Sequence, residues 1–295
     1  MGFALIFTKS MNRKITLYIK ISIVSLLLVI VYYNTFIWMA ERWARSSSYY
    51  SHGYFIPLIS GYLIWKARQS FYDNTFSFSL LGLVLLVTGA LLQIASAFMR
   101  IHFTSGLSFV VILTGITFFI FGNKLGIKLL FPLLFLLSMV PMPLSAVADL
   151  TLNLKLFAAR CTMSIIDLLG IPAVQDGSRI NFSNSSVLVA DACSGLKSLI
   201  ALISFGALFA YVSGLSSYMK SILFISSMPV AIIANITRIL IVSLAANRWG
   251  SEFADSIHGV TGILVFVIAF ILLFSISSVL SELESLFVNR KEQIV

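Results

Sequence analysis

Long runs of apolar residues, separated by short polar segments, dominate the pattern along the chain. Eight of these runs approach the length that an α-helix needs to cross a bilayer, which is about 20 residues. We predict membrane-spanning helices at 19–39, 53–67, 79–98, 103–122, 126–146, 196–213, 219–245 and 258–280. The run at 53–67 is the shortest of them, and "PMP" from Pro141 to Pro143 is expected to end or kink the fifth.

One longer polar segment, residues 147–195, interrupts this series. Its first part, "ADLTLNLKLFAARCTMSIIDLLG", carries apolar residues at helical spacing among scattered charges, which predicts an amphipathic helix at the membrane surface. Gly170 and Pro172 are expected to end that helix. The following stretch has turn signals at Asp176–Gly177 and Asn184–Ser185 between extended runs, and it predicts a small β-hairpin.

Composition agrees with a membrane protein. The chain has 295 residues, of which 59% are hydrophobic and 11% are charged, and its mean hydropathy is +1.01. A soluble domain carries about 25% charged residues, so a soluble class is excluded. We therefore expect an all-α polytopic membrane protein, a single domain over 1–295, with an interfacial helix and a hairpin on its outer face.

The distribution of charge predicts the orientation of the chain. The formal net charge is +9, but the basic residues stand singly beside apolar runs, which is typical of topology signals and of contact with anionic lipid rather than with nucleic acid. With eight spans, the short basic loops share one face, which we expect to be cytoplasmic. That face would carry Lys9, Arg13, Lys14, Lys20, Lys66, Arg68, Lys124, Lys128, Lys220, Arg290 and Lys291. Segment 147–195 would then lie outside.

Each of the last three predicted spans brings one unusual side chain to the outer face. Cys193 precedes the span at 196–213, Arg238 lies in the outer half of 219–245, and His258 opens 258–280. We find no metal-ligand spacing and no Gly-rich phosphate loop, so we expect neither a metal nor another cofactor.

Cys193 stands where a helix is predicted to begin. Asp191 or Ser194 could cap this helix, and its N-terminal dipole together with Lys197 would lower the thiol pKa. A low pKa favours the nucleophilic thiolate. The alternatives are a small buried hydrophobic residue or a disulfide with Cys161, which we expect to pack on the apolar side of its helix.

Arg238 lies inside an apolar run, where a guanidinium costs at least about 2.5–3.5 kcal/mol on insertion scales. A partner or a function is therefore expected. Asn235, three residues earlier, lies on the same helical face and could orient it. The alternatives are a residue that snorkels to the interface or an ion pair with Asp191 or Asp255.

Two histidines are candidates beside these residues. His258 is flanked by Gly259 and Gly262 and could transfer a proton near neutral pH, although a lone histidine is more often a satisfied interfacial residue. His52 also faces outward and could help to bind a substrate, although we favour a structural role for it.

A thiolate, a proton donor and a cation that stabilises an oxyanion are what nucleophilic acyl transfer requires. A rival class is a transporter or an export component of exopolysaccharide assembly, in which Arg238 would face a substrate path. A transporter should carry polar residues near the middle of several spans, whereas here they gather at one face. A third possibility is a scaffold that binds a sorting signal without cutting it.

These residues resemble the exosortases. The resemblance rests on "ACSGLKSL" at 192–199, "NITR" at 235–238 and "HG" at 258–259, and it extends to "SHGYFIPLISGYLIW" near the N-terminus and to "PMP". It implies a membrane cysteine protease or transpeptidase without a cofactor. Its implied partners are the bilayer and the C-terminal sorting signals of exported proteins, each made of a Pro-Glu-Pro-like motif, a transmembrane helix and a basic tail.

The resemblance also implies roles and a location. Cys193 would be the nucleophile, His258 the proton-transfer residue and Arg238 the stabiliser of the transition state. The family's Glu-Ala-Cys is replaced by Asp191-Ala192-Cys193, which leaves a role for this acid open. A histidine at this position is typical of bacterial members, so we expect the cytoplasmic (inner) membrane, with the site facing the periplasm or exterior.

Overall fold

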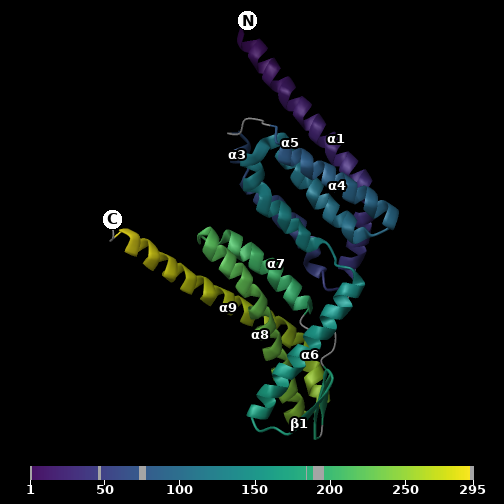
Figure 1. Cartoon of the computed structure of the whole chain (residues 1–295), viewed down its shortest axis with the longest axis vertical. Helices are drawn as coiled ribbons and strands as arrows, with labels where there is room; N and C mark the ends of the chain where they lie inside the picture. Colours follow the sequence, from purple (N-terminus) through teal and green to yellow (C-terminus); the bar gives the residue numbers. More distant parts are fainter. Residues whose placement is uncertain (1, 46–47, 73–77, 184, 189–195, 293–295) are drawn as a thin grey trace.

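The computed structural model describes residues 2–45, 48–72, 78–183, 185–188 and 196–292, and it is mostly helical (Figure 1). The longer helices are α1 (Gly2–Ala44), α2 (Phe55–Lys66), α4 (Leu80–Met99), α5 (His102–Phe135), α6 (Leu144–Leu168), α7 (Leu196–Val212), α8 (Ser217–Trp249) and α9 (Ser251–Glu292). Three short helices, η1 (Ser51–Tyr54), α3 (Gln69–Tyr72) and η2 (Leu136–Met139), lie in the N-terminal half. The strands are β1 (Ala173–Asp176), β2 (Arg179–Phe182) and β3 (Ser186–Leu188).

The eight predicted spans are confirmed in part. Within the described residues, five helices are long and apolar enough to cross a membrane: Ser22–Ala44, Leu80–Met99, His102–Met139, Ser217–Trp249 and Gly259–Leu286. The predicted span at 53–67 contains α2, which has 12 residues and is about 18 Å long. This is short of the roughly 30 Å hydrocarbon core. Helix α7, in place of the predicted span 196–213, has 17 residues and is also below the length of the other five.

The longest apolar stretch, His102–Met139, reverses direction at Gly122. This glycine has φ +73°, a conformation that side chains with a Cβ rarely adopt. Beyond this glycine the chain runs back along the first part of the stretch. Two close contacts show this: a Cβ on Gly126 would lie 2.7 Å from the Phe118 ring, and a Cβ on Gly106 would lie 2.6 Å from Val140. The turn falls between the predicted spans 103–122 and 126–146.

Hydroxyl groups join helices α1, α4 and α5. The buried Tyr32 of α1 is hydrogen-bonded to Ser108 of α5 at 2.6 Å, and the Ser108 hydroxyl donates to the Gly89 carbonyl of α4 at 2.7 Å. One turn further along α1, Thr35 contacts Ser105 at 2.6 Å. Such side-chain bonds hold helices together where the hydrophobic effect is absent.

Small residues let α4 and α5 approach until their backbones touch. A Cβ on Gly82 of α4 would overlap the backbone nitrogen of Phe119 and lie 2.6 Å from its Cα, while one on Gly115 of α5 would lie 2.9 Å from the Leu86 nitrogen. Close approach at glycines is a common way for membrane helices to gain van der Waals contact.

Replacing Gly82 by valine should therefore destabilise the protein by about 1–3 kcal/mol, because the backbone of α5 cannot yield as a flexible side chain would. Gly61→Val is the matched control, since Gly61 also lies in a helix but nothing is within 4 Å of its Cβ position. Thermal unfolding in detergent is the measurement. Equal midpoints for the two variants would contradict the prediction.

The segment after α5 has the predicted order of elements. Pro143 is the N-cap residue of α6, so "PMP" separates the preceding helix from α6 as expected. Helix α6 ends before Gly170, which has φ +72°. The three strands form an antiparallel sheet in the order β1-β2-β3, so the predicted hairpin is extended by a third strand. Asn184, in the second predicted turn, lies outside the described residues.

Helix α6 and the sheet pack on the C-terminal helices. Ala158 and Ala159 of α6 contact Ile239 of α8, and Ile180 of β2 is buried in a cluster with Val242 of α8. The hydroxyl of Ser251, the first residue of α9, lies 3.4 Å from the Ser186 carbonyl of β3. The structure thus has a helix, α6, where the surface helix was predicted, and its amphipathic character and its place at the membrane surface stay predictions.

Helices α8 and α9 form an antiparallel pair joined at Gly250, which has φ +88°. They share a core of small and branched residues, and α9 diverges from α7 and α8 toward its C-terminal end (Figure 1). Helix α9 begins at Ser251, seven residues before the predicted start at 258. Its first two turns are polar, so hydropathy did not reveal them. The apolar window itself begins at Gly259, directly after His258.

Candidate active site

Arg238 is buried between α8 and α9. Its side chain is 8% exposed, and its Nε donates a hydrogen bond to Thr261 Oγ1 of α9 at 3.4 Å. Its Nη2 lies 3.8 Å from the position that a Cβ on Gly262 would occupy. The guanidinium therefore lies against one turn of α9.

That turn of α9 follows His258. Thr261 and Gly262 come three and four residues after His258 within the same helix, and residues at these spacings share a helical face. The structure thus brings the predicted Arg238 and the backbone of the predicted His258 segment together. The side chains of His258 and of Asp255 lie outside the described part of the chain.

The third predicted member, Cys193, lies in segment 189–195, outside the described residues, as do Asp191 and Ser194. The described chain resumes at Leu196, which is buried at the start of α7, and Lys197 is exposed beside it. The meeting of the thiol with the other two groups stays a prediction. Cys161 is a half-buried free thiol on α6, so it is not bridged to another cysteine.

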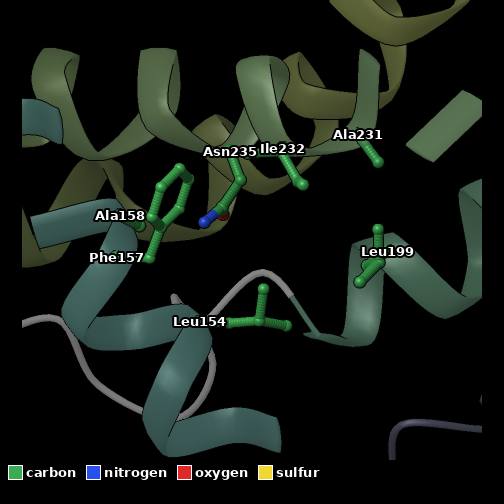
Figure 2. A pocket seen from close by; sticks show the side chains of 7 residues that line it. All are labelled: Leu154, Phe157, Ala158, Leu199, Ala231, Ile232 and Asn235. Atoms are coloured by element: carbon green, nitrogen blue, oxygen red, sulfur yellow. The ribbon is translucent and has the colours of Figure 1, made fainter. Parts of the chain in front are cut away.

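Asn235 lines a narrow, mostly apolar pocket between α6, α7 and α8, with about 260 Å³ of empty space that includes space open to the surroundings. Figure 2 shows its side chain directed from α8 toward Phe157 of α6, while Leu199 of α7 closes another side. The remaining lining residues are Leu154, Ala158, Ala231 and Ile232. Asn235 is 3% exposed, and the pocket lies one turn from Arg238 along α8. Its predicted role in orienting Arg238 stays a prediction.

Thr261 is a site residue that sequence reasoning missed. It is 4% exposed, and its hydroxyl accepts from Arg238. The signal was present in "HGVTG", where a hydroxyl follows His258 by one helical turn and is flanked by glycine. A threonine in an apolar helix usually bonds its own backbone, so it did not stand out.

His52 lies in η1, in the N-terminal half, packed against η2. Its ring stacks on Tyr50 with centroids 6.0 Å apart and is hydrogen-bonded to the backbone of Ser138, while its Nε2 is buried without a hydrogen-bond partner among the described residues. Burial lowers the pKa of the His52 imidazole below its ordinary value of 6.5. These contacts fit the structural role that we favoured, and a role in substrate binding stays untested.

The lowered pKa of His52 predicts an acid-sensitive fold. Because the unfolded chain takes up this proton at a higher pH than the folded one, the free energy of unfolding should fall as pH drops below about 6.5. The measurement is thermal unfolding in detergent between pH 8 and pH 5. His52→Gln should flatten the profile, whereas His102→Gln, at an exposed histidine, should leave it unchanged. Parallel profiles for wild type and His52→Gln would rule the effect out.

The family of the protein follows from its similarity to a known family model. The model of the transmembrane exosortase family matches residues 43–275. The chain belongs to the transmembrane exosortases. This confirms the resemblance drawn from the sequence motifs, and the matched range contains every predicted site residue of this exosortase. Comparisons with curated proteins and with solved structures find no match.

Proposed function

We propose that this exosortase is a membrane-embedded cysteine transpeptidase. It would cut the C-terminal sorting signals of exported proteins at the outer face of the bacterial inner membrane. The observation that supports this best is the buried Arg238, bound to Thr261 on the turn of α9 that follows His258. A buried guanidinium beside a histidine-bearing helix fits the stabilisation of an oxyanion better than it fits lipid contact.

The proposed reaction has two acyl-transfer steps. The thiolate of Cys193 attacks a peptide carbonyl of the signal, forming a C–S bond and a tetrahedral oxyanion. As the C–N bond breaks, His258 gives a proton to the leaving amine, and a thioester remains on Cys193. An acceptor nucleophile then attacks the thioester, loses its proton to His258 and releases the thiolate.

Arg238 would stabilise both tetrahedral intermediates. Its burial places the positive charge in a medium of low dielectric constant, where its interaction with an oxyanion is stronger than in water. The bond from Nε to Thr261 fixes the plane of the guanidinium, and the absence of a side chain at Gly262 leaves room beside Nη2. An extended peptide carbonyl could approach there.

The test is to look for the thioester. The Cys161→Ala exosortase, whose remaining thiol is Cys193, is mixed with a signal-bearing protein, quenched in acid and digested for mass spectrometry. We expect an acyl adduct on the Cys193 peptide that hydroxylamine removes. A preparation that still cuts the signal after complete alkylation of Cys193 would overturn the proposal.

A further inference from the structure

A second pocket lies near the other end of α9, between that helix and the end of α7. It has about 1020 Å³ of empty space, which includes space open to the surroundings. Its walls are Phe209, Ser213, Gly214 and Leu215 on one side and Phe274, Ser277, Ser281, Glu284 and Ser285 of α9 on the other. The α9 residues follow one another at intervals of three, four, three and one, so they share one helical face.

Glu284 is held at the wall of this pocket. The backbone N–H of Ser216, the N-cap residue of α8, lies 3.0 and 3.2 Å from its two carboxylate oxygens. Lys220 is directed away onto α7, where its ammonium donates to the Tyr211 carbonyl at 3.2 Å. Among the described residues, the pocket wall therefore carries a carboxylate and no cation.

This lining suits a cation on an apolar stem. The carboxylate of Glu284 and the serine hydroxyls can accept hydrogen bonds from an ammonium or a guanidinium. The rings of Phe209 and Phe274 can cover the methylene groups that carry such a head. Lysine and arginine side chains have this structure.

The position of the pocket points to the kind of molecule that carries the cation. Glu284 follows Thr261 by 23 residues in one continuous helix, which corresponds to about 35 Å. The hydrocarbon core of a bilayer is about 30 Å thick. A membrane-spanning helix with one end at the level of Arg238 would therefore have its other end at the level of the pocket.

The face of α9 that leads to the pocket is apolar and exposed, and it begins at Ile263, in the turn that also carries Thr261 on another side of the helix. Ile263, Val267, Phe270 and Phe274 follow one another at intervals of four, three and four residues, and their exposed fractions are 69%, 47%, 43% and 66%. Phe270 also contacts Phe205 of α7, and Phe274 lines the pocket. This stripe thus leads along α9 to the carboxylate.

We propose that the Glu284 pocket binds a lysine or arginine at the end of a substrate's transmembrane helix, and that this helix lies along the apolar stripe of α9. The inference rests on the proposed function, because it takes the Arg238 end of α9 as the place of cutting. The pocket would set how far the substrate helix enters the site, and so which peptide bond reaches Cys193.

The test measures binding without cutting. A signal-bearing protein with a photo-crosslinker in its transmembrane helix is co-expressed with Cys193→Ala exosortase that also carries Glu284→Gln or, as the matched control, Glu282→Gln. The glutamine keeps an oxygen that can accept from Ser216, so α8 stays capped. Glu282 is exposed on α9 and does not line the pocket.

We expect Glu284→Gln to lower the crosslinked fraction about three- to fivefold, the size of an ion pair near a protein surface. Glu282→Gln should leave it unchanged. Neutralising the basic residues of the signal should weaken binding by the same factor, with no additional loss in Glu284→Gln. Equal crosslinking by the two variants, or an unchanged Glu284→Gln effect with the neutral signal, would overturn the inference.

Failure of the proposed function is distinguishable from failure of this inference. Binding is read in Cys193→Ala protein, so it needs no chemistry at the thiol. If the signal were cut without Cys193, the reaction assigned above would be wrong while the crosslinking difference remained. If cutting needed Cys193 but Glu284→Gln left the crosslinked fraction unchanged, only the assignment of the pocket would be wrong.

Discussion

Replacing Cys193 by alanine should lower the processing of a co-expressed signal-bearing protein by at least about 10³-fold, to an undetectable level. In the proposed reaction, no other group can form the thioester, so the loss should appear as an accumulation of uncut substrate. The expected readout is a shift from short to full-length product on an immunoblot.

The matched control for this prediction is Cys161→Ala. Cys161 is the other cysteine of the chain, a free half-buried thiol on α6, and it has no part in the proposed reaction. Its replacement should preserve processing, and both variants should reach wild-type levels in the membrane. Processing by Cys193→Ala at the wild-type rate would end the cysteine mechanism.

Replacing Arg238 by glutamine should lower the rate of processing by about 10²–10³-fold, which is the usual cost of losing one oxyanion donor. The loss should fall on the rate at saturating substrate, because the charge is needed most in the transition state. Arg238→Lys keeps the charge but loses the planar fork that Thr261 holds, so it should recover only part of the activity.

Arg248→Gln is the control for this series. Arg248 lies on the same helix, in the last turn of α8, but it is exposed. Its replacement should leave the rate within about twofold of wild type, since isolated surface charges contribute little. An Arg238→Gln enzyme with a normal maximal rate and only a raised KM would show that Arg238 binds the substrate rather than stabilising its transition state.

Hydropathy predicted several helices closely, because lipid selects apolar side chains along the whole buried length. The predicted spans 79–98 and 196–213 correspond to Leu80–Met99 and Leu196–Val212. Hydropathy detects only the apolar part of a helix. It therefore missed the N-terminal part of α1, which begins at Gly2, and the polar first turns of α9. Hydropathy also led to the prediction of a membrane span at α2, because the segment is apolar, but the helix itself has only 12 residues.

Of the candidate site, the sequence could predict only the residues whose type is unusual in an apolar helix. A buried arginine is so costly in an apolar helix that Arg238 could be selected from the sequence alone. Its partner Thr261 could not, because an isolated threonine is unremarkable in such a helix and only the register between α8 and α9 brings the two together. That register arises from side-chain packing across the whole helix pair, which no local pattern encodes.

The reversal at Gly122 constrains how the protein is made. The two arms of α5 are joined at Gly122 and the polar Asn123 and Lys124 that follow it, with no long loop between them, so one arm cannot move far from the other during insertion. Backbone groups that enter the hydrocarbon must already be paired, which favours a preformed helical hairpin. The two arms are therefore expected to leave the insertion machinery together, and the second would carry Lys124 and Lys128 close to the lipid surface during that event.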